Sequence, residues 1–169
     1  MNCMNCGAPM SLLLNKQQFK CEYCFSTYFP DKNEDGIRIL DEESETGCPV
    51  CNIPLVYGYI DSVQTRYCLS CRGILIDQEV FLFVIDNMRA KSTKPTIQPP
   101  PVNLQELNRR IKCPRCGHSM STHFYGGPGN LVVDNCVNCS ILWLDNNEFN
   151  RVIRSPGRGA RNEIDNTDN

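Results

Sequence analysis

Cys-Pro-Arg-Cys occupies positions 113–116, and Cys-Val-Asn-Cys occupies positions 136–139, with nineteen residues between the two pairs. Two Cys-x-x-Cys pairs at about this separation have the ligand spacing of a zinc ribbon with four thiolates. The two residues inside each pair let the chain turn back, so that both sulfurs can face one ion. The segment between the pairs is long enough for a hairpin that brings them together. This spacing therefore predicts a hairpin built around a metal ion.

The same arrangement occurs twice more upstream, because the twelve cysteines form six Cys-x-x-Cys pairs with none left over. The intervals inside the three successive sets are fourteen, sixteen and nineteen residues. We therefore predict three structural Zn²⁺ ions, each held by one set of four cysteines. The three sets are Cys3, Cys6, Cys21 and Cys24; Cys48, Cys51, Cys68 and Cys71; and Cys113, Cys116, Cys136 and Cys139.

Disulfide bonds are the competing explanation for a chain so rich in cysteine. Residues 1–6 carry neither the basic start nor the apolar run of a signal peptide. No stretch approaches the roughly 18 apolar residues of a membrane span. We therefore expect bound zinc rather than disulfides, a cytoplasmic location and no membrane partner.

Each repeating unit is too small to be stabilised by an apolar core alone. A structural zinc ion can contribute roughly 10–16 kcal/mol to the folding of a small peptide unit. The predicted fold is therefore a small metal-stabilised α+β fold of three zinc ribbons, in which β-hairpins carry the cysteine sites. We name these units ribbon one, ribbon two and ribbon three in chain order.

Charge argues against a general affinity for nucleic acid. The formal net charge is −2. Because zinc bound to four thiolates carries a charge of about −2, three filled sites would bring the total to about −8. A nucleic-acid binder with this charge would need a local basic patch.

Composition divides the chain into six segments. Prolines are frequent from 92 to 102, and acidic residues are frequent from 31 to 47. The predicted segments are ribbon one (1–30), an acidic, solvated connector (31–47), ribbon two with a C-terminal helix (48–91), a Pro-rich linker (92–102), a short helix plus ribbon three with its C-terminal helix (103–154), and a disordered tail (155–169).

Three helices are predicted from their start signals. Asp77 is a candidate N-cap for a helix over 78–90. The pattern at 103–106 resembles a capping box that begins a helix over 104–111, and Asp145 with Glu148 gives the same signal for a helix over 146–154. The helix over 78–90 has apolar residues on more than one face. We expect both faces to pack inside the chain; the alternative is a homodimer or partner surface on this helix.

Two groups of side chains suggest nucleic-acid contact. The aromatic residues of ribbon one could stack on bases, although we expect them to cover the metal, because Lys20 and Lys32 are the only cations nearby. Arg109 and Arg110 on the helix that enters ribbon three, together with Arg151 and Arg154 on the helix that leaves it, are the candidate phosphate contacts. Arg158 and Arg161 would extend this basic group along the tail. The aromatic group consists of Tyr23, Phe25, Tyr28 and Phe29.

Ribbons two and three resemble the transcription-factor-IIB-type zinc-ribbon family of bacterial proteins. The family pattern is Cys-Pro-x-Cys, then leucine or methionine four residues later, then Cys-x-x-Cys followed by Gly-Ile-Trp-Leu-Asp and a helix. Leu55 and Met120 match, as do Gly-Ile-Leu-Ile-Asp at 73–77 and Leu-Trp-Leu-Asp at 142–145. Leu75 replaces the family's tryptophan. Ile141 replaces its glycine, so we expect a different turn after Cys139.

The whole chain also resembles bacterial proteins with three such ribbons. The resemblance implies the zinc sites and the fold, and it implies no particular reaction.

Catalysis has little support in the sequence. Four cysteines per set leave no open position on the metal, and neither His-Glu-x-x-His nor a serine triad is recognisable. We therefore predict a non-enzymatic interaction module that binds a protein partner, with a role in transcription or macromolecular assembly. A nucleic-acid-binding zinc ribbon and a thiol-based redox sensor are the alternatives.

Overall fold

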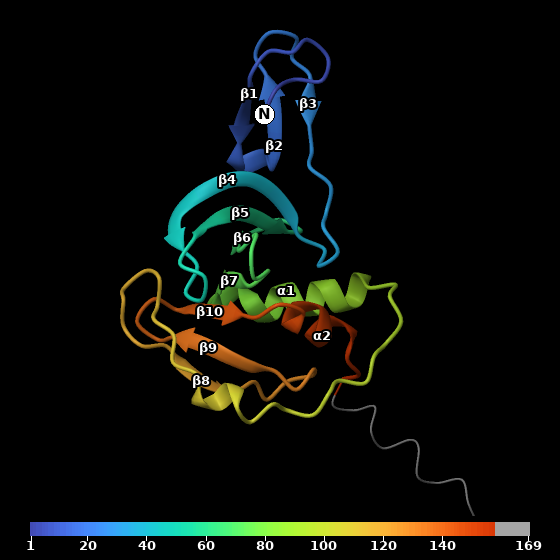
Figure 1. Ribbon diagram of the computed structural model, residues 1–169. Helices are drawn as coiled ribbons and strands as arrows, with labels where there is room; N and C mark the ends of the chain where they lie inside the picture. Colours follow the sequence, from blue (N-terminus) through green and yellow to red (C-terminus); the bar gives the residue numbers. More distant parts are fainter. Residues whose placement is uncertain (158–169) are drawn as a thin grey trace, which may run out of the picture.

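The computed structural model describes residues 1–157, apart from the side chains of Lys16 and Asp41 (Figure 1). Its antiparallel strands form a three-stranded sheet in the order β1-β2-β3 and a seven-stranded sheet in the order β4-β5-β6-β7-β10-β9-β8. The strands are β1 (Met10–Leu13), β2 (Gln18–Cys21), β3 (Thr27–Tyr28), β4 (Arg38–Gly47), β5 (Pro54–Ile60), β6 (Val63–Tyr67), β7 (Ile74–Asp77), β8 (Ser121–Phe124), β9 (Val132–Cys136) and β10 (Ile141–Leu144).

Two α-helices and two short 3-10 turns complete the described chain: α1 (Gln78–Lys91), α2 (Glu148–Arg154), η1 (Leu14–Lys16) and η2 (Glu106–Asn108). α1 follows β7 and α2 follows β10, and the two helices lie next to each other (Figure 1). The predicted α+β class is confirmed. Within residues 1–157, no helix is long and apolar enough to cross a membrane.

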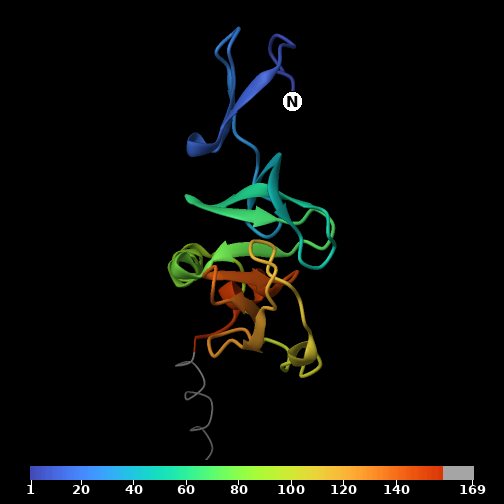
Figure 2. The same cartoon turned by 90° about the vertical axis from the view of Figure 1, so that its left-hand side faces the viewer.

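Ribbon one forms its own small sheet at one end of the molecule (Figure 2). The hairpin of β1 and β2 turns through η1, and β3 pairs with β2. A hydrogen bond from the Tyr59 hydroxyl to the Leu14 carbonyl, 2.8 Å long, joins this sheet to the larger one. A second contact runs from the Arg38 guanidinium to the Pro30 carbonyl.

Ribbons two and three join through a single pair of strands. In the antiparallel register of β7 and β10, Leu75 lies opposite Trp143. These two residues hold the same position after the last cysteine of their ribbons. The ribbons are therefore related by a local twofold axis at this pair. Ribbons two and three, which the sequence predicts as separate units, therefore share one continuous sheet.

Alternation along β7 and β10 separates two apolar cores, because successive side chains of a strand point to opposite faces. Ile74, Ile76, Leu142 and Leu144 face the helices and pack with Phe81, Val84, Phe149 and Val152. Leu75, Ile141 and Trp143 belong to the other core, which contains the cysteines of ribbons two and three. The metal sites of these two ribbons are thus built into one shared core.

The predicted helix over 104–111 is wrong. Only η2 forms there, and it packs beside β8. The Asn103 side chain accepts from the Gln105 N–H, while the Met120 N–H donates to the Ile111 carbonyl. Ile111 is buried, and the segment 111–112 pairs with residues 119–120. The backbone must therefore leave the helical conformation before Cys113.

Helix α1 confirms the predicted helix over 78–90 with one additional residue, and α2 begins two residues later than expected. Neither helix has a side-chain N-cap. The Asp77 carboxylate instead accepts from Arg115 at 3.0 Å. Half of the second capping box is present, because the Asp145 N–H donates to Glu148 at 2.8 Å.

The acidic segment 31–47 differs from the solvated connector that its composition predicts. Most of it is β4, an edge strand of the large sheet that pairs with β5. Asp35 is buried, binds Arg72 at 2.9 Å and accepts from Asn150 at 2.6 Å. The segment is therefore part of the fold.

The segment 92–102 is fixed at several points. The Ile97 N–H donates to the Arg154 carbonyl at 2.9 Å, and the Asn130 amide donates to the Pro100 carbonyl at 2.9 Å. Ser155, placed in the tail by its sequence, is buried, and its hydroxyl donates to the Arg151 carbonyl. The rest of the predicted tail from 158, with Arg158 and Arg161, lies outside the described residues.

Candidate metal centres and exposed surfaces

The three predicted cysteine sets come together as three separate clusters. Within each set, all four sulfur atoms lie within 4.8 Å of one another. Individual Sγ–Sγ distances are 3.6 Å for Cys3–Cys24, 3.5 Å for Cys6–Cys21, 3.6 Å for Cys48–Cys71 and 3.6 Å for Cys116–Cys136. Tetrahedral zinc with Zn–S bonds of about 2.3 Å requires Sγ–Sγ distances of about 3.8 Å. The donor sets therefore fit three structural Zn²⁺ ions, as predicted.

Burial within each Cys-x-x-Cys pair follows one rule. The first cysteine of every pair is buried, and the second is partly or fully exposed. In ribbon one, the Ser26 hydroxyl lies 3.1 Å from the Cys24 sulfur and lowers the pKa of that thiol to about 5. In ribbon two, burial raises the pKa of the Cys48 thiol to about 11. Because a thiol must lose its proton to bind zinc, the metal has to stabilise the thiolate more strongly at Cys48 than at Cys24.

All six Cys-x-x-Cys turns have the same backbone shape. The residue after the second cysteine always has a positive φ, and in five turns its N–H donates to the carbonyl of the first cysteine. Glycine adopts this conformation readily, whereas other residues do so at a cost. The residues and their φ values are Gly7 (74°), Phe25 (59°), Asn52 (59°), Arg72 (61°), Gly117 (73°) and Ser140 (50°).

The expected difference in the turn after Cys139 is wrong, because Ser140 and Arg72 have nearly the same φ. Glycine is required at position 73 for a steric reason and not for the conformation of the turn. A Cβ atom there would lie 2.1 Å from the Trp143 ring, so the indole occupies the space that glycine leaves. By the local twofold, Ile141 corresponds to Gly73 and Leu75 corresponds to Trp143. The two departures from the family pattern are therefore coupled: with Ile141 present, a tryptophan at 75 would have no room.

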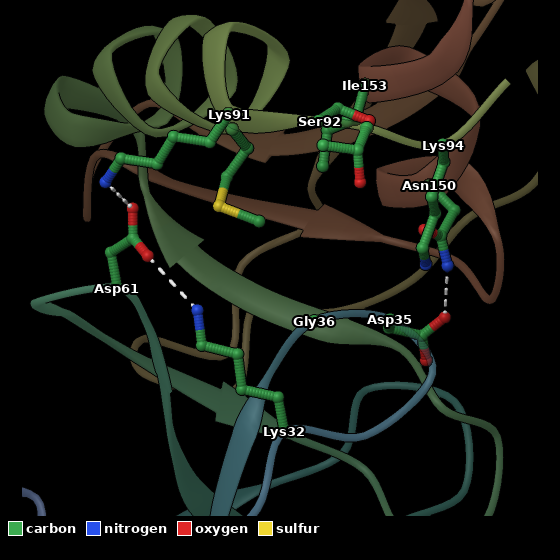
Figure 3. Close-up of a pocket in the computed structure, with 11 residues that line it drawn as sticks. Lys32, Asp35, Gly36, Asp61, Lys91, Ser92, Lys94, Asn150 and Ile153 are labelled. Carbon is green, nitrogen blue, oxygen red and sulfur yellow. Dashed lines mark hydrogen bonds and ion pairs between the residues drawn. The ribbon is translucent and has the colours of Figure 1, made fainter. Parts of the chain in front are cut away.

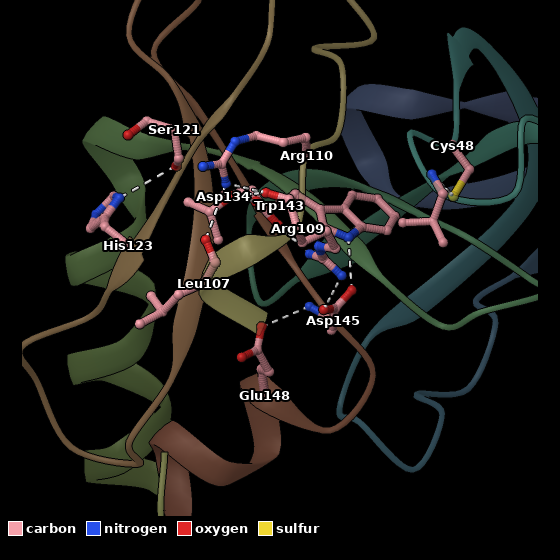
Figure 4. A network of polar contacts seen from close by, with 12 residues as sticks. Cys48, Leu107, Arg109, Arg110, Ser121, His123, Asp134, Trp143, Asp145 and Glu148 are labelled. Atoms are coloured by element: carbon pink, nitrogen blue, oxygen red, sulfur yellow. Dashed lines mark hydrogen bonds and ion pairs between the residues drawn. The ribbon is translucent and has the colours of Figure 1, made fainter. Parts of the chain in front are cut away.

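Arg109 is the centre of an internal polar network (Figure 4). Its guanidinium forms ion pairs with Asp134 on β9 and with Asp145 after β10. Asp145 also accepts from the Trp143 indole at 3.0 Å, and Asp134 accepts from the Thr122 hydroxyl. Burial opposes the charge on Arg109, but the two carboxylates outweigh it and raise the pKa of the guanidinium. Arg109 thus ties β8, β9 and β10 together.

The other candidate nucleic-acid contacts lie in two places. Arg110 is exposed beside η2 and donates to the carbonyls of Leu107 and Arg109. Arg151 and Arg154 lie on α2, where they line a cavity with Lys94. The predicted helix over 104–111, to which Arg109 and Arg110 were assigned, is reduced to η2, which packs beside β8. Contact with nucleic acid by these arginines stays a prediction.

The aromatic group of ribbon one is exposed, which overturns the expectation that it covers the metal. Tyr23 is 79% exposed and Phe25 is 69% exposed, and Tyr28 and Phe29 are also exposed. Phe19 is the aromatic residue of ribbon one that is buried. The Lys20 ammonium lies 5.6 Å from the centroid of the Phe25 ring. This exposure leaves the rings accessible, as the base-stacking alternative requires.

Helix α1 also keeps part of its apolar surface exposed. Phe81, Val84 and Ile85 are buried, whereas Leu82 is 58% exposed and Phe83 is 59% exposed. The expectation that both faces pack inside the chain is therefore wrong for Leu82 and Phe83.

Comparison with family models gives two matched regions. Residues 47–82 and 112–155 match the family described as transcription factor zinc-finger. Comparison with curated proteins gives no match, and comparison with solved structures gives none. Ribbon one lies outside both matched regions, so its assignment rests on the geometry of its cysteines. Ribbons two and three are therefore each similar to the zinc ribbons of the transcription factor zinc-finger family.

Proposed function

We propose that the protein is a non-enzymatic interaction module, in which zinc stabilises the ribbons and ribbon one binds a protein partner. The observation that carries this proposal is the exposure of Tyr23, Phe25, Tyr28 and Phe29 on one small ribbon. Large exposed apolar groups on a soluble protein mark interaction sites, and aromatic residues dominate the energetics of interface centres. Met4, which is 94% exposed, lies on the same ribbon and adds an adaptable apolar contact.

The metal sites support a binding role over a catalytic one. Four thiolates complete the coordination of zinc, so no position is open for a substrate or an activated water. A ribbon held in this way provides a rigid surface, and rigidity lowers the entropy cost of binding. The proposed role is cytoplasmic, in transcription or macromolecular assembly; the description of the matched family, transcription factor zinc-finger, supports the transcription part of this proposal.

Electrostatics favours a protein partner over nucleic acid at ribbon one. The chain carries about −8 with zinc bound. Lys20 is paired with Glu22 at 3.4 Å, so its charge is partly compensated. Leu82 and Phe83 on α1 form a second exposed apolar surface, which would serve a homodimer and is separate from the partner site on ribbon one.

The test is affinity capture with the zinc-loaded full chain, with and without nuclease, followed by binding measurements on the purified partner. The test variant is Tyr23→Ser with Phe25→Ser, and the matched control is Leu82→Ser with Phe83→Ser. All four side chains are exposed, so both variants should fold. We expect capture to survive nuclease and direct binding to be lost only in the ribbon-one variant. Capture that depends on nucleic acid, or equal loss in both variants, would contradict the proposal.

A further inference from the structure

A cavity of about 520 Å³ lies between the Pro-rich segment and α2. We call it the linker cavity. Its volume falls within the range of small-molecule sites. The wall formed by the Pro-rich segment is held to α2, because the Arg154 Nε donates to the Pro95 carbonyl at 3.1 Å and the Ile97 N–H donates to the Arg154 carbonyl at 2.9 Å.

Positive charge in the linker cavity exceeds negative charge. Lys94, Arg151 and Arg154 line it, together with the single carboxylate of Glu34. The Glu34 side chain is 86% exposed and lies 3.4 Å from Arg72, so it is already partly engaged outside the cavity. Three cations and one carboxylate therefore line the cavity; the Lys94 ammonium also donates to the Glu34 carbonyl at 2.9 Å, and Arg151 is paired with Glu148, which does not line the cavity.

The two arginines have unused capacity to bind an anion. Of the three guanidinium nitrogens of Arg154, only Nε has a hydrogen-bond partner within residues 1–157. The Arg151 Nε is buried and has no acceptor, and the neighbouring carboxylate of Glu148 lies 3.3 Å from Nη2. Burial raises the pKa of Glu148 to about 7, so its negative charge is only partly present near neutral pH. The charge of Arg151 is thus incompletely compensated.

A smaller cavity of about 220 Å³ adjoins the first and shares Lys94 and Asn150 with it (Figure 3). Met88 and Ile153 give it an apolar wall. Its other two cations, Lys32 and Lys91, share the carboxylate of Asp61, at 3.3 and 2.7 Å. A charged compartment and a more apolar one therefore lie next to each other.

We infer that the linker cavity binds a phosphorylated small molecule of about nucleotide size, with its phosphate at Lys94 and Arg154 and its organic part against Met88 and Ile153. A guanidinium matches phosphate oxygens in a fork, and a lysine adds a mobile point charge. Arg151 strengthens the local positive potential. This site is separate from ribbon one and does not depend on the partner proposed there.

The test is calorimetric titration of the zinc-loaded full chain at low salt with adenosine monophosphate, inorganic phosphate and adenosine. We expect the monophosphate to bind most tightly, inorganic phosphate to bind more weakly and adenosine to give no signal. Lys94→Gln and Arg154→Gln should each weaken binding of the monophosphate by roughly tenfold or more, because each removes a charge-assisted bond. Lys112→Gln makes the same charge change at an exposed position that does not line the cavity and should leave the affinity unchanged.

Melting curves separate binding from folding. Arg154→Gln removes a bond to the Pro-rich segment, whereas Lys94 is exposed, so Lys94→Gln gives a readout even if the arginine variant is unstable. Absence of binding by both phosphate ligands, or an equal loss in Lys112→Gln, would overturn the proposal. Tighter binding of oligothymidine than of the monophosphate, with a steep loss as salt rises, would replace the small ligand with a nucleic-acid strand.

Discussion

Gly73 and Trp143 are the residues through which the two family ribbons fit together. A Cβ at position 73 would lie 2.1 Å from the indole, so Gly73→Ala must displace a fully buried ring. Overpacking of this kind costs about 1–3 kcal/mol or more, and we expect that loss in chemical unfolding of the zinc-loaded chain. Gly47→Ala is the control, because its nearest neighbour would be 4.0 Å away.

The double variant Gly73→Ala with Trp143→Leu tests the coupling directly. In this variant the leucine at position 143 would lie against the side chain of residue 73. The related pair, Leu75 against Ile141, already has this combination of a leucine and a residue with a side chain. We expect the two changes to be non-additive, with the double variant more stable than the sum of the single losses predicts. Simple additivity would mean that Gly73 is required for another reason.

Glu148 should give the stability a measurable pH dependence. Burial raises the pKa of its carboxyl from 4.5 to about 7. Between these values the folded chain keeps a proton that the unfolded chain releases, so the free energy of unfolding contributed by this group falls as pH rises. At pH values above the pKa of the folded state, this group lowers the free energy of unfolding by about 3 kcal/mol. Glu148→Gln mimics the protonated acid and should remove this loss.

Urea unfolding of both zinc-loaded proteins across pH 5–8 provides the measurement. Zinc coordination also depends on pH, but it affects both proteins alike, so the difference between them isolates Glu148. The variant should gain stability over the parent as pH rises. Parallel curves would show that the carboxyl titrates normally in the folded chain.

At the scale of elements, what the sequence predicts best is local. Cysteine spacing identifies all three metal sites because each is made by one hairpin, and α1 is predicted to within one residue. The failures concern contacts between distant segments. β4 reads as a solvated connector because its exposed side chains are acidic, yet β5 supplies its backbone partner. Residues 104–111 have the sequence signals of a helix, but the backbone of 111–112 pairs with residues 119–120 instead.

Ribbon one should behave as a separate element. It has its own sheet, and Cys6 in its metal site is exposed. We expect Cys21→Ser to reduce the bound zinc from three ions to two, while the melting transition of the remaining chain is unchanged. Elemental analysis alongside calorimetry checks both parts of this prediction. A lowered transition for the remaining chain would show that ribbon one stabilises the large sheet.

The whole molecule is a fused pair of ribbons that carries a third. The pairing of β7 with β10 places the cysteines of ribbons two and three in one apolar core with Leu75, Ile141 and Trp143. Zinc in one of these ribbons therefore holds in place the strand against which the other ribbon folds. The two metal sites should be energetically coupled, although no ligand is shared between them.

Cys136→Ser tests this coupling, because it removes a buried ligand of ribbon three and leaves all four ligands of ribbon two in place. We expect the variant to lose the zinc of ribbon three and also to release the zinc of ribbon two at a lower chelator concentration than the parent does. Cys21→Ser serves as the control, since ribbon one lies in the other sheet. If ribbon two kept its parental resistance to chelator, the ribbons would be independent units that merely touch, and the twofold joint would contribute little to metal retention.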